Sequence, residues 1–245
     1  MSGKIALQLY SVRDLLPKDF AGTIRRIAAM GYEGIETGDF PGTTLSEATK
    51  LFKKLGLSVT SAHIFPPPVG DKLKEAMEVM SQLNSKRIVS GYGPDRFDTL
   101  DKTKRACEEF NKANALARAN GLILGIHNHW WEYLKVESSY PYKVMLEYLD
   151  PTVEFQVDTY WVKTAGVDPA IVVKELGKRA PLLHIKDGPA VKEKPNVAVG
   201  DGSLDVPAIV KAGEGATEWL IVEFDSCATD IMVAVEKSCQ YLRKL

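Results

Sequence analysis

The chain of 245 residues contains few cysteines and no long apolar run. Its three cysteines, Cys107, Cys227 and Cys239, form no Cys-X-X-Cys pair. This odd, sparse set excludes a disulfide-stapled scaffold and favours free thiols in a reducing compartment, so we expect a cytoplasmic protein. No apolar run approaches the roughly 20 residues that a transmembrane helix needs, and the apolar stretch at the N-terminus is too short for a secretory signal. We therefore expect no membrane partner.

The chain also lacks an excess of charge of either sign. Lysine and arginine together number 31 and aspartate and glutamate 32, which gives a net charge of -1. No basic surplus is present to neutralise a phosphate backbone or an anionic lipid surface, so we expect no nucleic-acid partner. With 45% hydrophobic and 26% charged residues, the composition is that of a globular protein that is large enough to bury its own core.

What the sequence does contain is a regular alternation of short apolar runs and longer stretches with helical periodicity. Eight runs of strand character begin near residues 5, 34, 57, 87, 122, 153, 182 and 219. The helix-like stretches cover residues 20–30, 45–55, 71–83, 99–120, 142–149, 169–176, 206–212 and 229–242. Glycines follow several of these stretches, and Asp168 and Pro169 are typical of an N-cap and a first helical position.

Nearly continuous apolar strands that alternate with helices predict a parallel sheet that is buried on both faces. Eight regular units favour a closed barrel over an open sheet. No linker separates the units. The sequence therefore predicts the α/β class and a single-domain (βα)8 TIM barrel over residues 1–245.

Polar residues stand at or near the end of nearly every predicted strand. They are Gln8, Tyr10, Glu36, His63, Ser90, His127, His129, Asp158, His184, Lys186, Glu223 and Asp225. The catalytic groups of TIM barrels come from these strand ends and the loops that follow them. Side chains two positions apart on a strand point the same way, so His127 with His129, and His184 with Lys186, can each face one cavity.

All four histidines of the chain belong to this set. A single histidine at a strand end is more often a hydrogen-bonded core residue than a ligand. Four that converge with Asp158 and Glu223 indicate a bound cation, because carboxylates brought together raise one another's pKa unless a cation neutralises them. Imidazole and carboxylate donors suit Mn²⁺, Co²⁺, Fe²⁺ or Zn²⁺ better than Ca²⁺ or Mg²⁺. We predict one such divalent metal.

Seven short strings in the chain carry a family resemblance. They are LQLYSVR (7–13), GIE (34–36), GIHNHWWEY (125–133), VDTYWVKTAG (157–166), HIKDG (184–188), VGDGSLD (199–205) and IVEFD (221–225). In this order they resemble the sugar phosphate isomerase/epimerase group of the xylose isomerase-like TIM-barrel superfamily, and the resemblance spans the whole chain.

The resemblance implies a single divalent metal held by residues from the fifth to the eighth strand. Asp158, His184 and Glu223 match the family's ligand positions on the last three of these strands. Many members place a glutamate at the end of the fifth strand, where this chain has His127. We predict His127 as the fourth ligand, with His129 and Glu132 as alternatives.

The resemblance also implies a reaction on a keto-sugar or a related polyol. In the family the metal polarises a carbonyl and a carboxylate removes the adjacent proton. Glu223 is the predicted base. Epimerisation through an enediolate uses glutamates on both the fifth and the eighth strand, so His127 also leaves open a keto-sugar dehydratase or lyase in which Lys186 or His129 acts as the acid. We place the isomerase or epimerase first and the lyase second.

Glu36, His63 and Trp161 are the predicted substrate-binding residues. Glu36 and His63 would line the wall opposite the metal strands, and a tryptophan ring such as Trp161 can stack on the apolar face of a sugar. Lys186 has an alternative interpretation, as the ion-pair partner of Asp187 or Glu36. No arginine cluster marks a phosphate site, which favours an unphosphorylated sugar or polyol.

Two other classes of protein remain as alternatives. Apurinic endonucleases belong to the same superfamily. They need a larger set of ligands for several metals than a chain with four histidines offers, and they need a basic surface, which a net charge of -1 does not provide. A non-catalytic sugar-binding barrel is suggested by the missing glutamate. In each of the sugar-directed interpretations the partner is a small molecule, and a homo-oligomer is left open.

Overall fold

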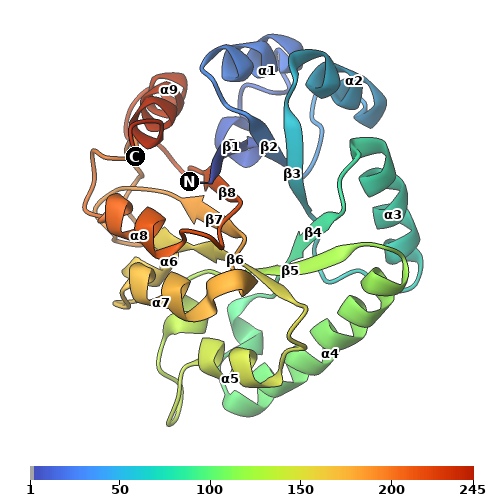
Figure 1. Cartoon of the computed structure of the whole chain (residues 1–245), viewed down its shortest axis with the longest axis vertical. Coiled ribbons are helices and arrows are strands. Elements are labelled where there is room, and N and C mark those ends of the chain that lie inside the picture. Colours follow the sequence, from blue (N-terminus) through green and yellow to red (C-terminus); the bar gives the residue numbers. More distant parts are fainter. Residues whose placement is uncertain (1–2) are drawn as a thin grey trace.

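Eight parallel strands close into a barrel in chain order in the computed structural model, which describes residues 3–245 (Figure 1). The strands are β1 (Lys4–Gln8), β2 (Gly34–Thr37), β3 (Ser58–His63), β4 (Arg87–Ser90), β5 (Ile123–His127), β6 (Glu154–Asp158), β7 (Leu182–Ile185) and β8 (Trp219–Val222). Pairing of β8 with β1 closes the ring, with Val222 opposite Leu7. The predicted TIM barrel is confirmed. Its predicted extent over residues 1–245 stays a prediction, because residues 1 and 2 lie outside the described residues.

Helices follow the strands and cover the outside of the barrel (Figure 1). They are α1 (Phe20–Ala29), α2 (Leu45–Leu55), α3 (Asp71–Leu83), α4 (Leu100–Ala119), α5 (Pro141–Tyr148), α6 (Thr159–Thr164), α7 (Pro169–Leu176), α8 (Val206–Ala212) and α9 (Ile231–Leu242). The predicted stretches differ from these helices by at most two residues at either end. The exception is α6, which the sequence did not predict. Its N-cap is Asp158, whose Oδ1 accepts a hydrogen bond from the backbone N–H of Trp161 at 3.0 Å.

Local signals in the sequence explain where several helices begin and end. Thr44 and Glu47 form a reciprocal capping box at the start of α2, and Gly56 ends that helix in the left-handed region at φ 71°. Asp168 caps α7 through the N–H of Ala170. Such caps satisfy backbone groups that a helix end leaves without partners.

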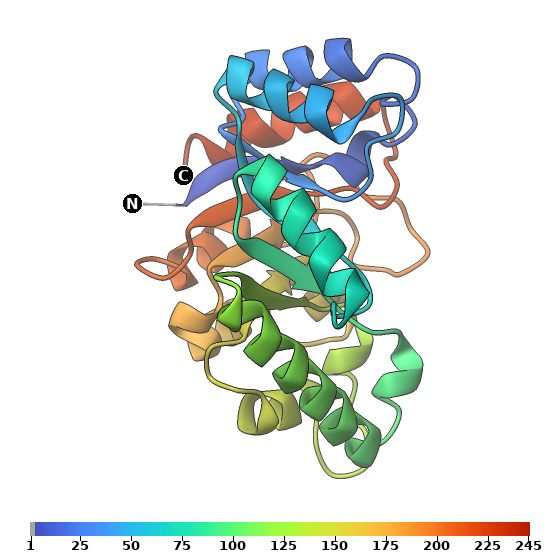
Figure 2. The same ribbon diagram turned by 90° about the vertical axis from the view of Figure 1, so that its right-hand side faces the viewer.

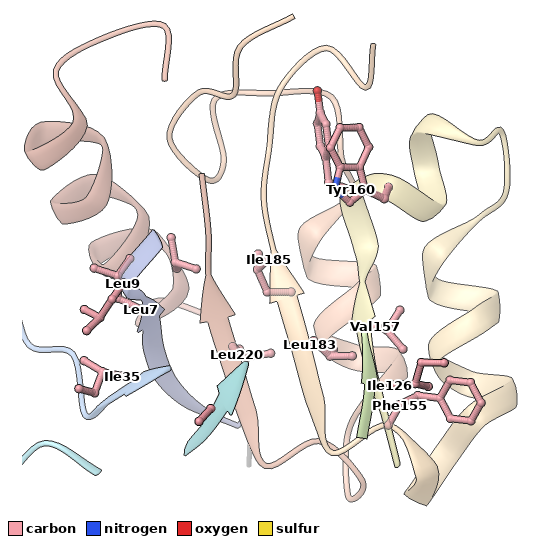
Figure 3. Packing of buried hydrophobic residues seen from close by; sticks show 14 of the residues in the cluster. Leu7, Leu9, Ile35, Ile126, Phe155, Val157, Tyr160, Leu183, Ile185 and Leu220 are labelled. Atoms are coloured by element: carbon pink, nitrogen blue, oxygen red, sulfur yellow. The ribbon is translucent and has the colours of Figure 1, made fainter. Parts of the chain in front are cut away.

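Alternate residues along the strands divide the barrel into an outer and an inner layer, because neighbouring side chains on a strand face opposite ways. The outer layer packs under the helices, and Figure 3 shows part of it, including Ile35, Val157 and Leu183. A separate apolar cluster fills the interior and consists of Ala6, Val89, Leu182, Trp219 and Ile221. Two positions further along β1, β7 and β8, the same alternation directs Gln8, His184 and Glu223 into the barrel.

The amino-terminal end of the barrel interior is closed by an ion cluster. Arg87 on β4 donates to Glu154 on β6 at 2.6 and 3.2 Å and to Glu218 at 3.0 Å through two nitrogens. Close above it, Gly34 leaves room for the ring of Trp219, since a Cβ at this glycine would lie 2.7 Å from a ring carbon. Side chains therefore fill the interior at this end, and the cavity opens at the opposite end.

Figure 2 shows both chain termini on one side of the barrel, where β1 starts, so the carboxyl ends of the strands open on the other side. Cys107, Cys227 and Cys239 are free thiols, as predicted. Within residues 3–245, no helix combines the length and the apolar character that crossing a bilayer requires.

Candidate active site

A cavity of about 800 Å³ opens at the carboxyl ends of the strands. Polar side chains from β3, β5, β7 and β8 and their loops line it: His63, His127, His129, Lys186 and Glu223. Two aromatic rings, Tyr10 after β1 and Phe65 after β3, also line it and keep 52% and 48% of their surface exposed. A cavity of this size can enclose a sugar-sized or larger ligand.

His184 lies between two carboxylates in the centre of the polar cluster. Its Nε2 lies 2.5 Å from Glu36 Oε2 and its Nδ1 lies 2.9 Å from Glu223 Oε2. Burial alone lowers the pKa of an imidazole, but the two opposite charges raise the pKa of His184 to about 10. At neutral pH His184 therefore carries a proton on each nitrogen and donates both to carboxylates.

Lys186 brings together three carboxylates. Its Nζ lies 2.9 Å from Asp158 Oδ2, 2.6 Å from Glu223 Oε2 and 2.7 Å from Asp225 Oδ2. The ammonium also lies 5.3 Å from the centre of the Trp161 ring. Burial opposes the charged form, but the three carboxylates hold the pKa of Lys186 well above its usual value. Likewise, burial works against ionisation of Glu223, yet Lys186 and His184 hold its pKa well below the usual range.

Beneath the cavity, Glu36 and Gln156 connect strands on opposite sides of the barrel. In addition to His184, the Glu36 carboxylate accepts hydrogen bonds from the side chains of Gln8 (2.8 Å), Ser61 (2.5 Å) and Gln156 (2.5 Å). The Oε1 atom of Gln156 lies 2.8 Å from His63 Nε2 and 2.9 Å from His127 Nδ1. Burial raises the pKa of a carboxyl group, but His63 and His184 hold the pKa of Glu36 well below its usual range.

The loop after β5 carries two further buried titratable groups. His129 stacks on Trp131, with ring centres 4.1 Å apart, and burial followed by the charge of Lys186 lowers the pKa of His129 to about 4. Glu132 accepts a hydrogen bond from the His129 N–H at 2.9 Å, and burial raises the pKa of Glu132 to about 8. Burial and the neighbouring His184 also hold the pKa of His127 well below its usual value. His127 and His129 are therefore neutral imidazoles.

Two groups of side chains have donor atoms close enough to hold a cation, within 4.8 Å of one another. One is Asp158, His184 and Glu223, and the other is His63, His127 and His184. Mixed imidazole and carboxylate donors in the first group suit a divalent first-row transition metal.

The charges around the first group also fit a cation. Two positively charged side chains, Lys186 and His184, contact four carboxylates, which are those of Glu36, Asp158, Glu223 and Asp225. Burial raises the pKa of Asp158 to about 6. The charge of Lys186 opposes this rise, and the charge of Glu223 adds to it. The Oδ2 atom of Asp158 is buried and makes no hydrogen bond of normal geometry, although Lys186 lies near. A cation bound here would neutralise the excess negative charge and would coordinate the unused oxygen of Asp158.

The structure gathers most of the predicted site residues at one end of the barrel. They are His63, His127, Asp158, His184, Lys186 and Glu223, with Glu36 directly below. Trp161 and Glu36, which we predicted to bind substrate, are both buried and do not line the cavity. Trp161 packs on Trp130, with ring centres 4.9 Å apart. Lys186 pairs with Asp158, Glu223 and Asp225, and not with Asp187 or Glu36 as the alternative interpretation supposed.

Sequence reasoning missed several residues of the site, among them Ser61, Phe65 and Gln156. Gln156 had a usable signal, because it stands two positions before Asp158 on the same strand and therefore faces the same way. Ser61 stands two positions before His63 and has the same relation to it. Phe65 lies in a loop beside three prolines and had no chemical signal of its own.

The fold and this polar end define a TIM barrel with a site at the carboxyl ends of its strands. The sequence model of the xylose isomerase-like TIM barrel family matches residues 24–245, and the chain belongs to this family. No curated protein matches the sequence significantly.

Several solved structures share the fold over nearly the whole chain. A sugar phosphate isomerase/epimerase from Parabacteroides distasonis is 26% identical, with a TM-score of 0.84 over 98% of this chain and 93% of its own. The probable 3-DHS dehydratase AsbF of Bacillus anthracis, involved in petrobactin synthesis, is 13% identical, with a TM-score of 0.80 over 98% of each chain. The IOLI protein, solved with a bound zinc atom, is 14% identical, with a TM-score of 0.73 over 98% of this chain and 95% of its own. The last two likenesses show the fold alone.

Proposed function

We propose that this protein is a divalent-metal-dependent isomerase or epimerase that removes a proton beside the carbonyl of a keto-sugar or a related polyol. The observation that supports this most is the meeting of Asp158, His184 and Glu223 with Lys186 at the end of the cavity. Membership of the xylose isomerase-like family and the likeness to an isomerase/epimerase agree with it. The proposed substrate would make it an enzyme of carbohydrate metabolism, and the free cysteines favour the cytoplasm as its compartment.

Asp158, His184 and Glu223 are the residues that would hold the metal. A bound Mn²⁺, Co²⁺, Fe²⁺ or Zn²⁺ ion would supply a Lewis acid that polarises the substrate carbonyl. His127 stays the proposed fourth ligand, since its neutral ring lines the cavity while its Nδ1 is bonded to Gln156. His129 and Glu132 remain the alternatives.

Glu223 is the proposed base, because among the grouped metal donors it is the carboxylate that lines the cavity. Lys186 would stabilise negative charge that develops on the substrate oxygen, since its ammonium lies 2.6 Å from Glu223 Oε2 and also lines the cavity. His63 would bind a hydroxyl group of the substrate through its other ring nitrogen, Nδ1, which can accept a hydrogen bond. The exposed rings of Tyr10 and Phe65 are better placed than Trp161 to stack on a sugar.

The substrate is proposed to be unphosphorylated. Arg13 lines the cavity, but its guanidinium donates to the backbone oxygens of Tyr10 at 2.9 Å and Asp225 at 2.8 Å and packs on the Tyr10 ring. A guanidinium that is already bonded in this way has less capacity left for a phosphate group. Comparing KM for a ketose and for its phosphate ester tests this choice.

Exchange of the substrate proton with solvent tests the reaction. The protein is stripped of metal, reloaded with each of the four ions, and incubated with ketopentoses and ketohexoses in D₂O while proton NMR follows the hydrogen beside the carbonyl. We expect loss of this signal only in the metal-loaded samples. A protein that takes up no ion, or exchanges no substrate, contradicts the proposal, and sugar binding without exchange identifies a binding protein.

Replacing the proposed base is the first variant to make. Glu223→Gln should lower the exchange rate by about 100-fold or more, as expected for loss of a general base, while the other donors retain much of the metal. Asp39→Asn is the matched control, because Asp39 lines the same cavity but has no assigned role. Exchange at the wild-type rate in Glu223→Gln would remove Glu223 from the mechanism.

A dehydratase or lyase is the second candidate, and one feature of the site favours it. Lys186, a proton donor, adjoins the proposed base, while β5 and the loop after it present the imidazoles of His127 and His129 where a second carboxylate would complete an epimerase. Elimination gives a dehydrated product that accumulates, and isomerisation gives an equilibrium mixture of sugars with the same mass. Mass spectrometry of the products therefore separates the two reactions.

A further inference from the structure

Glu36 is buried outside the cavity that would hold a substrate. It ends the inner face of β2, has no exposed surface, and does not line the cavity. Its contacts reach across the barrel to His184 on β7 and Gln156 on β6, which are 148 and 120 residues away in the chain. Whatever Glu36 does for the site, it does through these side chains.

Every polar side chain that contacts Glu36 is a donor to it. Oε2 receives Gln8 Nε2 and His184 Nε2, and Oε1 receives Ser61 Oγ and Gln156 Nε2, at 2.5 to 2.8 Å. His63 Nε2 also lies 3.2 Å from Oε2. An ionised carboxylate can only accept hydrogen bonds. Glu36 therefore fixes which atom of each neighbour carries a proton.

For His184 this fixes the role of its two nitrogens. Nε2 must keep its proton, because it faces the Glu36 carboxylate at 2.5 Å. Only Nδ1 can give up its proton and present a lone pair, and Nδ1 lies on the side of Glu223, 2.9 Å from its Oε2. The lone pair of His184 is thereby directed towards the carboxylate donors.

On His127 Glu36 acts through Gln156, and on His63 it acts both through Gln156 and by a direct contact of 3.2 Å. The amide nitrogen of Gln156 is taken by Glu36, so its oxygen faces His63 Nε2 and His127 Nδ1 and accepts from both. Those two nitrogens carry protons and cannot ligate a metal. The same carboxylate thus directs the lone pair of His184 to the first donor group and takes two imidazole nitrogens away from the second.

We propose that Glu36 is a positioning residue that holds His184 as the Nε2–H tautomer and so selects Asp158, His184 and Glu223, not His63, His127 and His184, as the metal site. This rests on the proposed metal dependence. Carboxylates that orient a ligating histidine commonly change metal affinity by 10- to 100-fold. This positioning role differs from the predicted substrate-binding role, because Glu36 would act without contacting the sugar.

The tautomer itself is the most direct test, and it needs no variant. In the zinc-loaded wild-type protein with ¹⁵N-labelled histidine, long-range ¹H–¹⁵N NMR reports which ring nitrogen of His184 carries a proton, and His184→Asn identifies its signals. We expect a protonated Nε2 and a metal-bound Nδ1. A protonated Nδ1 with a metal-bound Nε2 would overturn the proposal.

A conservative substitution tests the effect on binding. In Glu36→Gln the amide NH₂ meets neighbours that are all donors, so Gln156 or His184 has to reorient. We expect the affinity for Co²⁺, measured by calorimetry, to fall about 10- to 100-fold, with an altered visible Co²⁺ spectrum. Asp39→Asn removes one carboxylate from the cavity wall without touching His184, so it should keep both affinity and spectrum.

The outcomes separate this inference from the proposed function. Wild-type protein that binds none of the ions contradicts both. Wild-type protein that binds Co²⁺ while Glu36→Gln binds it with equal affinity and the same spectrum contradicts only the role of Glu36. Equal losses in Glu36→Gln and Asp39→Asn would show a general charge effect and would also contradict positioning by Glu36.

Discussion

Of three buried glutamates in this barrel, one differs from the other two in its pKa because its neighbours differ. Glu36 faces His184, and Glu223 faces both His184 and Lys186, so opposite charges hold the pKa values of both carboxyl groups well below the usual range in spite of burial. Glu132 has no cationic partner among its hydrogen bonds, and burial raises its pKa to about 8. Chemically identical side chains thus acquire distinct properties from their surroundings.

The raised pKa of Glu132 makes a prediction about stability and pH. The folded-state pKa lies above that of an unfolded glutamate, so its stabilising contribution is fully present below about pH 4 and is lost as pH rises through about 8. Between about pH 6 and pH 9 the melting temperature of Glu132→Gln should therefore fall less than that of the wild type. Thermal melts across this range measure the difference in slope.

The control for this experiment is Glu75→Gln on the exposed face of α3, which should keep the wild-type slope. Identical pH profiles for wild type and Glu132→Gln would show that Glu132 is already ionised at neutral pH in the folded protein.

At the scale of elements, the long connection from β7 to α8 is held by one carboxylate. Asp187 is buried and accepts four backbone N–H groups, from Gly188, Gly200, Gly202 and Leu204, at 2.8 to 3.2 Å. No larger residue fits at position 202 without movement, because a Cβ there would lie 2.0 Å from Asp187 Oδ1. This anchor lies directly after Lys186, so it also fixes the backbone that carries the site lysine.

Asp187→Asn should release part of this loop. The amide keeps one acceptor oxygen and turns a donor towards backbone N–H groups, so charge-assisted hydrogen bonds are lost. We expect the free energy of unfolding to fall by about 2–4 kcal/mol and hydrogen exchange to speed up in residues 188–204. Asp201→Asn, an exposed position in the same loop, should change stability by no more than about 0.5 kcal/mol. Equal stability of the two variants would contradict the anchor role.

At the scale of the whole molecule, a stabilising ion cluster and the candidate site lie at opposite ends of the barrel. The ion cluster of Arg87 with Glu154 and Glu218 closes the amino-terminal end, and the apolar interior cluster lies between it and the polar site. The proposed ligands, with His127 as the fourth, come from β5, β6, β7 and the end of β8, so a bound cation would tie together four neighbouring strands. Both ends contribute to holding the ring closed, but only one contains the site.

This separation predicts that the two ends respond independently. Arg87→Met leaves the partly buried Glu154 without its partner and should cost about 1–3 kcal/mol of stability. Mn²⁺ at about 100 times its Kd should stabilise wild type and Arg87→Met alike, by about 2.7 kcal/mol, and a chelator should reverse the effect. Denaturant unfolding with and without metal measures both. A metal effect that is lost in Arg87→Met would show that the two ends are coupled.

Much of the fold could be predicted because its signals are local. Helix ends such as Gly56 and the Asp168–Pro169 cap depend on a few neighbouring residues, and the alternation of runs that indicated eight units depends on periods of two and 3.6 residues. The exception among the helices, α6, begins at Asp158, a residue that we had interpreted only as a metal ligand. The residue pattern gave no sign that this aspartate is both a helix cap and a site residue.

The sequence predicted many of the residue types at the candidate site, but it did not predict which side chains contact one another. The strand ends indicated Asp158, His184, Lys186 and Glu223, and the barrel rule placed them at one rim. The sequence did not predict that Trp161 is buried beside Lys186 or that Phe65 lines the cavity. Such details depend on how loops from different units pack against one another.

The sequence by itself determined the eightfold alternation, the charge balance and the kinds of donor at the strand ends, because these follow from residue type and short-range period. Only the tertiary structure decided that His184 lies between Glu36 and Glu223, and that Gln156 turns its oxygen to two histidines. These partners lie on strands that are far apart in the chain, and closure of the barrel with one particular register brings them within hydrogen-bonding distance.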